Sequence, residues 1–386
     1  MFVFMENSML KSFSVSNFRI FKNLVTIDFS KICDYDFKLE CLKDNCVRTA
    51  IMYGDNAGGK TSLAFALFDI VTSLTNKNSN INNYNNYLNN ESNNPYAAFK
   101  YVFQFDGFEV VYKYKKASVV EFVSEKLTLN DKVLIEYDKT LEGNDLIIDI
   151  PGAENLSRDL SKIKISILKY IKSNTVLDNP DINFVFDELF SFVDNMLLFW
   201  SLETRDSIGF DSDPRNNIIS NIVKNGSFNE LQDFFNECGF TDELIHSNIS
   251  GIEELYIKYP NGKTVSFADA SSTGMNSLLL VFYWLQNIKK NERVPSFIFI
   301  DDFDAFYHFK LSRHIVKELM SKELIKMKCQ ILVTTHNTSL MTTDILRPDC
   351  YYICSKDKIV NLNNATQKSI KVWHNLENLY KGGTFN

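Results

Sequence analysis

Long apolar runs are missing from this chain of 386 residues. No stretch reaches the ~18 consecutive apolar residues that a membrane-spanning helix needs. The segment Met1 to Met5 has neither the basic flank nor the apolar length of a secretory signal peptide. We therefore expect a cytoplasmic protein with no membrane partner.

Paired cysteines are missing as well. The seven cysteines are an odd number and scattered, and no C-x-x-C pair occurs among them. This pattern indicates neither a disulfide framework nor a zinc site. We expect reduced, structural thiols.

An excess of basic residues is also absent, because the formal net charge is −7. This balance argues against wholesale nonspecific DNA binding, although a local basic face can coexist with it. No internal repeat is visible. The length allows two or three domains, and a hydrophobic content of 45% is ample for a core.

What the chain does contain is a complete G-x-x-x-x-G-K-[ST] phosphate-binding loop between a β-type run (48–53) and a mostly apolar helical run (62–71). The glycines let backbone N–H groups turn toward a triphosphate, the lysine reaches the β- and γ-phosphates, and the threonine hydroxyl binds Mg²⁺. The loop and its first helical residue are Gly54, Asp55, Asn56, Ala57, Gly58, Gly59, Lys60, Thr61 and Ser62. We expect them to bind ATP.

A second part of such a site follows the apolar strand 297–300, which ends in Asp301 and Asp302. Ligands of open α/β sheets bind at the carboxyl ends of strands. Asp301 is therefore the candidate Mg²⁺ ligand and Asp302 the candidate general base. The alternative is an acidic loop after a buried strand. The presence of a complete phosphate loop makes this alternative weaker than a metal site.

Another apolar strand, 330–335, ends at His336. A histidine there can hydrogen-bond the γ-phosphate and report its presence, and the alternative is a capping histidine of the next segment. Upstream, Ser271 to Leu278 opens a long apolar helix. A serine, a glycine and a helix N-terminus form an anion site, and the alternative is a simple N-cap by Ser272.

The organisation along the chain is α/β. Residues 10–30 predict an antiparallel hairpin, and two more strands meet at an Asp106-Gly107 turn. The asparagine-rich segment 76–94 predicts a mobile surface loop that does not pack. Amphipathic helices are expected over 159–172, 181–200 and 227–237. From 253 onward, strands, an apolar helix over 278–288 and alternating helices and buried strands indicate a parallel sheet.

In this order the pieces resemble the ATP-binding-cassette ATPases of the RecF, SMC and OLD kind, above all the single-chain AAA-like ATPases linked to abortive infection. The resemblance covers nearly the whole chain. It rests on six segments: N-F-R-I-F (17–21), the phosphate loop, S-T-G (272–274), D-D-F-D-A-F-Y-H (301–308), T-T-H (334–336) and the ending L-Y-K-G-G (379–383).

The resemblance implies an ABC-type head with a mixed or antiparallel β lobe, a parallel core sheet and an inserted helical region. We expect an N-terminal ATPase lobe at 1–148, a helical insertion at 149–250 and a C-terminal ATPase lobe at 251–386. In such ATPases two heads sandwich two ATP molecules, so Ser272 and Gly274 would act on the nucleotide of a second copy. Arg19 would lie near the nucleotide.

Two features depart from the family pattern. Asp302 stands where the family usually has glutamate, and its side chain is one methylene shorter, so we expect slow turnover. The family's Q-loop glutamine has no evident counterpart, and Gln104 in a strand-like run is the available candidate.

The resemblance favours a phage-defence or toxin–antitoxin ATPase, a hydrolase whose ATP-driven dimer or larger assembly controls a separate nuclease or toxin effector. The chain has no long heptad arms and no acidic cluster that would suggest a fused nuclease. The alternative is a RecF-like repair ATPase that binds duplex DNA through lysines such as Lys162, Lys164, Lys169 and Lys172, or through Lys310, Arg313 and Lys317. A third alternative is the ATPase subunit of a transporter. The β-rich insertion and the helical region make it the least favoured of the three.

Overall fold

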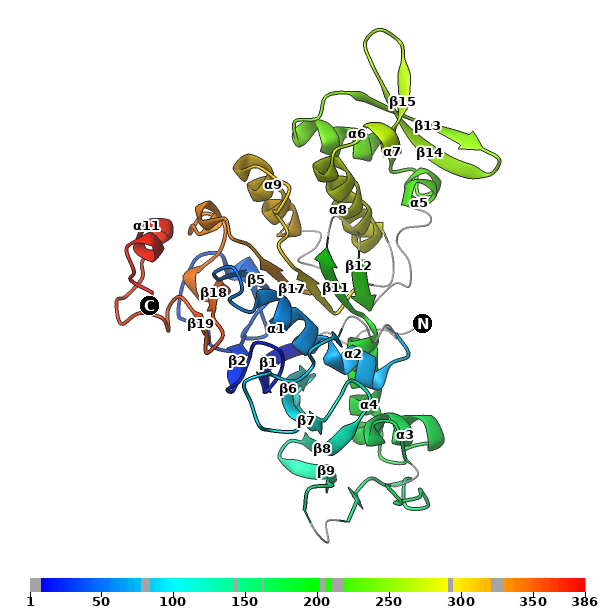
Figure 1. The fold of residues 1–386 in the computed structure, drawn as a ribbon, viewed down its shortest axis with the longest axis vertical. Coiled ribbons are helices and arrows are strands. Elements are labelled where there is room, and N and C mark those ends of the chain that lie inside the picture. The colour runs from blue at the N-terminus through cyan, green and yellow to red at the C-terminus, as the bar shows by residue number, and fades with distance from the viewer. Residues whose placement is uncertain are drawn as a thin grey trace.

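The computed structural model describes residues 8–77, 84–141, 145–160, 163–201, 206–209, 218–290, 294–320 and 329–385. Two seven-stranded sheets form the body, and a three-stranded sheet projects from it (Figure 1). The expected α/β fold is confirmed.

The core sheet is mainly parallel. Five parallel strands lie between an antiparallel strand at each edge, in the order β12 (Asp206–Gly209), β11 (Met196–Ser201), β16 (Phe297–Ile300), β17 (Gln330–Thr334), β5 (Thr49–Tyr53), β18 (Tyr351–Cys354) and β19 (Ile359–Asn361). Strands β16, β17 and β5 are neighbours, so the three motifs that follow them meet at one edge of the sheet.

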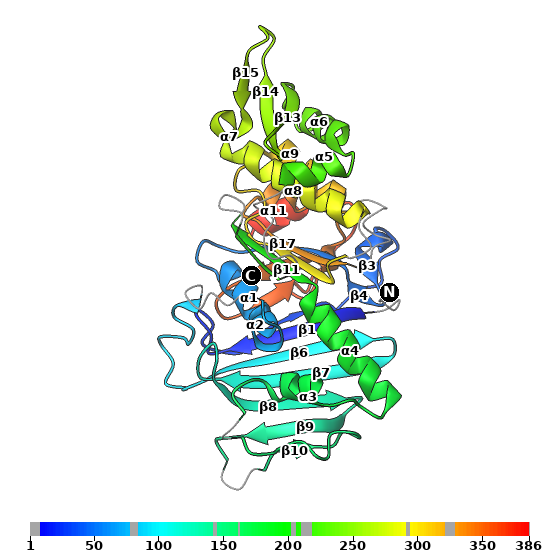
Figure 2. The same ribbon diagram turned by 90° about the vertical axis from the view of Figure 1, so that its right-hand side faces the viewer.

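Helices cover both faces of this sheet. Figure 2 shows α8 (Thr273–Lys290) and α9 (Phe309–Leu319) on one side, and α1 (Lys60–Leu67) and α2 (Asp69–Leu74) on the other. Strands buried on both faces read as continuous apolar runs, which explains the Phe297 to Ile300 segment.

The second large sheet, here called the β lobe, is antiparallel throughout. Its strands are β10 (Ile147–Ile148), β9 (Lys132–Asp138), β8 (Phe122–Leu129), β7 (Phe108–Lys116), β6 (Ala97–Phe105), β1 (Ser8–Ser16) and β2 (Val25–Asp28), in that order. Asp106 and Gly107 both have positive φ, as a tight two-residue hairpin turn requires. The hairpins predicted over 10–30 and around Asp106-Gly107 are confirmed.

One face of the β lobe packs against α3 (Ile167–Asn174) and α4 (Pro180–Asp194), as Figure 2 shows. The side chain of Asn179 caps α4 by accepting a hydrogen bond from the Ile182 N–H, and Pro180 occupies the first turn. The rings of Phe103 and Phe192 meet across this contact with centroids 5.3 Å apart.

The projecting part contains α5 (Ile218–Lys224), α6 (Phe228–Glu237), β13 (Glu243–Ile249), β14 (Ile252–Lys258), β15 (Thr264–Ser266) and α7 (Phe267–Ala270) (Figure 1). It packs on α8 through the rings of Phe234 and Phe282, whose centroids are 5.5 Å apart. Short elements complete the fold: η1 (Leu39–Cys41), β3 (Leu42–Lys43), β4 (Cys46–Val47), η3 (Thr338–Leu340), η4 (Pro348–Cys350) and α11 (Leu376–Lys381).

The prediction of a helix over 181–200 is wrong at its end, because α4 stops at Asp194 and strand β11 follows. Periodicity cannot separate a short, fully buried strand from a buried helix, and Met196 to Trp200 is a continuous apolar run. The helix predicted over 159–172 begins only at Ile167. The boundaries at 148/149 and 250/251 stay predictions, and the middle part is not purely helical because β11 and β12 belong to the core sheet.

The prediction that the asparagine-rich segment does not pack is wrong for its described second half, while residues 78–83 lie outside the described chain. Tyr84, Tyr87 and Asn89 are buried. The Tyr87 ring packs edge-on against Phe18 with centroids 5.1 Å apart. Two tyrosines among the asparagines therefore anchor the segment, and its composition concealed them.

Candidate functional site: a phosphate-binding pocket at the edge of the core sheet

The phosphate loop runs from the end of β5 to the start of α1, in the strand–loop–helix order that its motif requires. Gly54 must lack a side chain, because a Cβ there would lie 2.5 Å from the carbonyl oxygen of Cys354. Gly59 has φ 107°, and a Cβ there would lie 2.8 Å from the Phe21 ring. No side chain caps α1, so its first N–H groups face the loop as an anion site.

The rest of the loop keeps this turn tight. The N–H of Gly58 donates to the carbonyl of Asp55 at 2.9 Å, and Ala57 adopts φ 61°. Asn56 and Asp55 are exposed, and Ser62 is half-buried in the first turn of α1. These positions suit binding through the backbone rather than through side chains.

Lys60 is buried and held between two acceptors. Its Nζ donates to the carbonyl of Gly54 at 3.1 Å and lies 2.8 Å from Nε2 of His336. An ammonium group has only donors, so Nε2 must accept this bond and the proton of the neutral ring sits on Nδ1. The lysine and the histidine that the sequence predicted at separate motifs therefore contact each other directly.

Asp301 and Thr61 meet at the predicted metal position. The Thr61 hydroxyl donates to Oδ2 of Asp301, and the Thr334 hydroxyl donates to Oδ1 at 2.6 Å. Asp301 is 4% exposed, and burial raises the pKa of its carboxyl against the opposing effect of these two hydrogen bonds. A buried carboxylate with a hydroxyl beside it is a set of hard oxygen donors that fits Mg²⁺.

Asp302 lies beside this pair in a strained backbone conformation. Its φ is 44°, in the left-handed region, and its N–H donates to the Thr334 hydroxyl at 2.8 Å. Its Oδ1 atom is buried without a hydrogen-bond partner among the described residues and lies 3.6 Å from Nε2 of His336. This distance is too long for a hydrogen bond, and Nε2 is already an acceptor for Lys60.

A third acid, which the motifs do not predict, also lies at the site. Asp304 accepts a hydrogen bond from the Thr335 hydroxyl at 2.7 Å, and burial raises the pKa of its carboxyl. It thus anchors the residue before His336. The run Asp301, Asp302, Asp304 was the available signal.

Arg19 lies at a neighbouring pocket of about 590 Å³. Its N–H donates to the Tyr87 carbonyl at 3.1 Å, and its guanidinium carbon lies 4.0 Å from the Phe65 ring centroid on α1. Burial lowers the pKa of this guanidinium.

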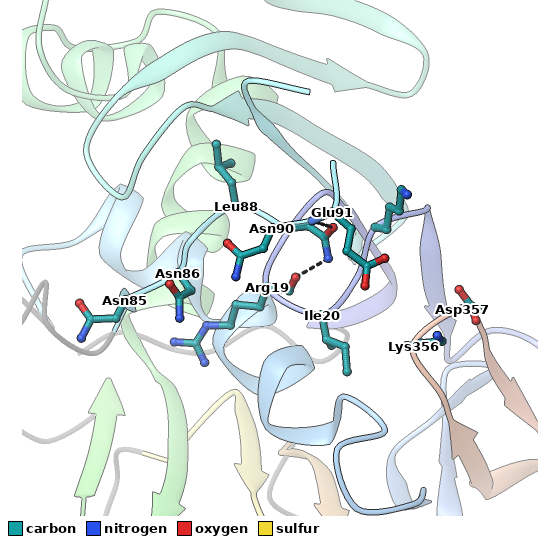
Figure 3. A pocket seen from close by; sticks show the side chains of 11 residues that line it. Arg19, Ile20, Asn85, Asn86, Leu88, Asn90, Glu91, Lys356 and Asp357 are labelled. Carbon is teal, nitrogen blue, oxygen red and sulfur yellow. Dashed lines mark hydrogen bonds between the residues drawn. The ribbon is translucent and has the colours of Figure 1, made fainter. Parts of the chain in front are cut away.

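The pocket joins three segments (Figure 3). Figure 3 shows Asn86 and Asn90 of the asparagine-rich segment near Arg19, while Lys356 and Asp357 line the opposite side. The full lining is Arg19, Ile20, Lys22, Asn85, Asn86, Leu88, Asn89, Asn90, Glu91, Lys356 and Asp357.

Ser272 is exposed and caps α8, because its hydroxyl accepts a hydrogen bond from the Met275 N–H at 3.3 Å. A Cβ on Gly274 would lie 3.1 Å from the carbonyl oxygen of Phe306. The N-cap interpretation of Ser272 is confirmed by its bond to Met275. No described hydrogen bond links Ser272 to the phosphate loop of its own chain. A role toward a second copy stays a prediction.

Three of the seven candidate DNA-binding residues make contacts within the chain. Lys169 Nζ donates to the Thr75 carbonyl at 2.8 Å, and Lys172 pairs with Asp187. Arg313 pairs with Asp344 at 3.4 Å. Lys162 lies outside the described residues, and Gln104 lies in β6 opposite Glu109 of β7.

A family model matches most of the chain. Residues 50–342 match the family described as "AAA domain, putative AbiEii toxin, Type IV TA system". This match covers well over half of the chain and includes the phosphate loop, Asp301, Asp302 and His336. The chain therefore belongs to this family.

Solved structures resemble the chain at low identity. The SMC head domain from Thermotoga maritima is 13% identical, with 92% of this chain and 99% of that chain covered and a TM-score of 0.43. An SMC head bound to the C-terminal winged-helix domain of ScpA is 17% identical, with coverages of 92% and 98% and a TM-score of 0.47. The recombination mediator RecF is 13% identical, with coverages of 92% and 99% and a TM-score of 0.42.

No curated protein matches the sequence at a significant level. Among the described residues, no helix is long and apolar enough to cross a membrane.

Proposed function

We propose that the chain binds ATP with Mg²⁺ and hydrolyses it. The observation that carries this proposal is the contact of Lys60 with His336, beside the Thr61–Asp301 pair and the unpartnered oxygen of Asp302. The buried Lys60 ammonium contacts a histidine and a backbone carbonyl, and no carboxylate of the described residues lies within ion-pair distance of it. A triphosphate would supply the missing negative charge.

Each residue then has a role. Lys60 turns from His336 to the β- and γ-phosphates, which frees Nε2 of His336 to bond the γ-phosphate. Thr61 and Asp301 hold Mg²⁺, which when bound neutralises the charge of the phosphate oxygens. Asp302 accepts the proton of the attacking water, and its short side chain makes turnover slow.

The pocket at Arg19 is the place for the nucleoside half. Ile20 and Phe21 pack against Gly59, so the pocket adjoins the end of the phosphate loop. Its asparagine amides offer both donors and acceptors to a base or ribose.

A second copy of the chain completes the site in this proposal. Ser272 is exposed, and two exposed aromatic side chains, Phe306 (37%) and Phe309 (42%), lie in the segment that packs on Gly274. An apolar surface around the α8 N-terminus suits a subunit interface. Ser272 and Gly274 would then contact the γ-phosphate held by the partner copy.

The cycle would serve as a switch in a cytoplasmic anti-phage system. The family description names a toxin of a type IV toxin–antitoxin system, which supports a role in abortive infection. ATP closes the pair, hydrolysis opens it, and a separate nuclease or toxin subunit responds to the difference.

Trapping the closed state tests this function. Asp302→Asn, tagged and purified from its native host, should retain ATP and bring a stoichiometric nuclease or toxin subunit with it. Recovery of duplex DNA with recombination proteins and no such subunit would instead support a RecF-like repair ATPase.

A further inference from the structure

The C-terminal helix α11 (Leu376–Lys381) overlaps the ending L-Y-K-G-G (379–383), to which the catalytic scheme gives no task. The side chain of Asn375 caps α11 by accepting a hydrogen bond from the Asn378 N–H at 2.8 Å. Leu376 is fully buried, which fixes the helix on the body of the protein. Two other side chains of α11 contact segments that flank the phosphate site.

The first is Glu377. Its Oε1 accepts a hydrogen bond from the Thr338 hydroxyl at 2.8 Å and an ion pair from Lys381 at 2.7 Å. Thr338 opens η3, two residues after His336. Glu377 therefore holds the short segment 334–340, here called the switch segment, which carries His336.

The segment is held at its other end by the acids of the site. Thr334 bonds Asp301 at 2.6 Å, and Thr335 bonds Asp304 at 2.7 Å. The Thr338–Glu377 bond holds the segment from the other side of His336, while Lys60 contacts His336 itself. His336 thus lies between two fixed ends.

The second side chain is Tyr380. Its ring lies 6.3 Å, centroid to centroid, from that of Tyr53, the last residue of β5 before Gly54. Burial, and then the charge of Asp55, raises the pKa of the Tyr380 hydroxyl. Helix α11 therefore spans from the switch segment to the entry of the phosphate loop.

Tyr53 adds a further observation. It is 1% exposed, and its hydroxyl has no hydrogen-bond partner among the described residues. The charged groups that influence it include Asp304 and Glu377. An unsatisfied buried hydroxyl is costly, so this junction of β5, the switch segment and α11 is not optimised for stability.

We propose that α11 is a positioning element of the ATP site, in which Glu377 sets the place of His336 through Thr338 while Tyr380 packs behind the phosphate loop. This inference rests on the proposed ATPase function and names residues that act on it without touching the nucleotide. Losing the Thr338–Glu377 bond should leave ATP binding intact, because the phosphate loop is unchanged, and should misplace His336.

The test uses the full-length chain and Thr338→Val, which removes the hydroxyl donor at nearly constant volume. We expect kcat for ATP to fall about ten- to a hundred-fold, as for a displaced positioning group, with KM unchanged. Thr338→Ser keeps the hydroxyl and should restore kcat, and Glu377→Gln keeps an acceptor and should lie between. The double variant Thr338→Val/Glu377→Ala should be no worse than Thr338→Val alone.

A second readout does not depend on hydrolysis. The ring resonances of His336, assigned by their loss in His336→Gln, should move in Thr338→Val and return in Thr338→Ser. Trp373→Ala is the matched control, because Trp373 precedes α11 and is 77% exposed. It should change neither the resonances nor kcat.

Three results would overturn the inference: wild-type kcat with unmoved His336 resonances in Thr338→Val, equal loss in Thr338→Ser, or equal loss in Trp373→Ala. Melting temperatures of all variants identify a general loss of folding. If the wild type neither binds nor hydrolyses ATP, the proposed function fails, whereas the His336 resonances still decide whether α11 positions the switch segment.

Discussion

Two buried polar clusters of this protein differ in how completely their groups are paired. In the β-lobe cluster, Asp69 accepts hydrogen bonds from Lys116, Tyr87 and Tyr114 at 2.9 to 3.2 Å, and both members of the ion pair are fully buried. In the phosphate-site cluster, Lys60 rests on His336, and an oxygen of Asp302 has no described partner. The first arrangement is complete without a ligand, and the second is completed by one.

The largest expected effect is on the complete cluster. Lys116→Met would leave Asp69 as a buried, uncompensated carboxylate and lower the free energy of unfolding by about 3–5 kcal/mol, measured by urea denaturation. Lys115→Met on the same strand breaks a partly exposed pair with Asp138 and should cost at most about 1 kcal/mol. Equal costs for the two variants would remove the distinction between this cluster and a surface ion pair.

The incomplete cluster should respond in catalysis instead. Asp302→Asn should lower single-turnover ATP hydrolysis about 10²- to 10³-fold with little change in stability. Asp302→Glu, which restores the missing methylene, should raise turnover above that of the wild type. Asp131→Asn in the β8–β9 turn is the control. Equal rates for the wild type and Asp302→Asn would exclude Asp302 as the base.

The pH dependence of the free energy of unfolding should also report on the phosphate-site cluster, through Asp301. Burial raises the pKa of Asp301 above its unfolded value of about 3.9, so between the two pKa values the folded state holds a proton that the unfolded state has lost. Stability therefore falls as pH rises through this window, by less than about 1.4 kcal/mol per pH unit for this group, and no loss arises below the unfolded pKa. In urea titrations Asp301→Asn should flatten this slope, and an unchanged slope would contradict the assigned cause.

The smallest effect concerns the exposed end of α8. Ser272→Ala should cost about 1 kcal/mol of stability through loss of the cap, and Ser272→Asn should recover it because asparagine caps equally well. If Ser272 also acts on a partner's nucleotide, ATP turnover should be lower than in the wild type in both Ser272→Ala and Ser272→Asn. Wild-type turnover in that variant would leave Ser272 as a cap alone.

The sequence places Lys60, Asp301 and His336 after strands because each motif is local, and their binding roles stay predictions. Lys60, Asp301 and His336 lie far apart in the chain, but strands β5, β16 and β17 are neighbours, and this adjacency brings them together. The Lys60–His336 contact itself could not be predicted, since it depends on side-chain direction. The acid run 301–304 points to Asp304, but its role depends on the contact with Thr335, which the sequence does not show.

The errors have similar local causes. Strand β11 was mistaken for helix because burial on both faces removes the alternation that marks a strand. The packed half of the asparagine-rich segment was mistaken for a loose loop because Tyr84 and Tyr87 are few among many amides. In both cases tertiary contacts outweighed composition.

The central claim is that a triphosphate takes Lys60 from His336. Calorimetric titration of the wild type and Lys60→Ala with ATP and Mg²⁺ tests it most directly, with Lys368→Ala as the exposed control. The account predicts saturable binding to the wild type and the control and severe loss in Lys60→Ala. No binding to the wild type, or equal affinity in Lys60→Ala, would contradict it.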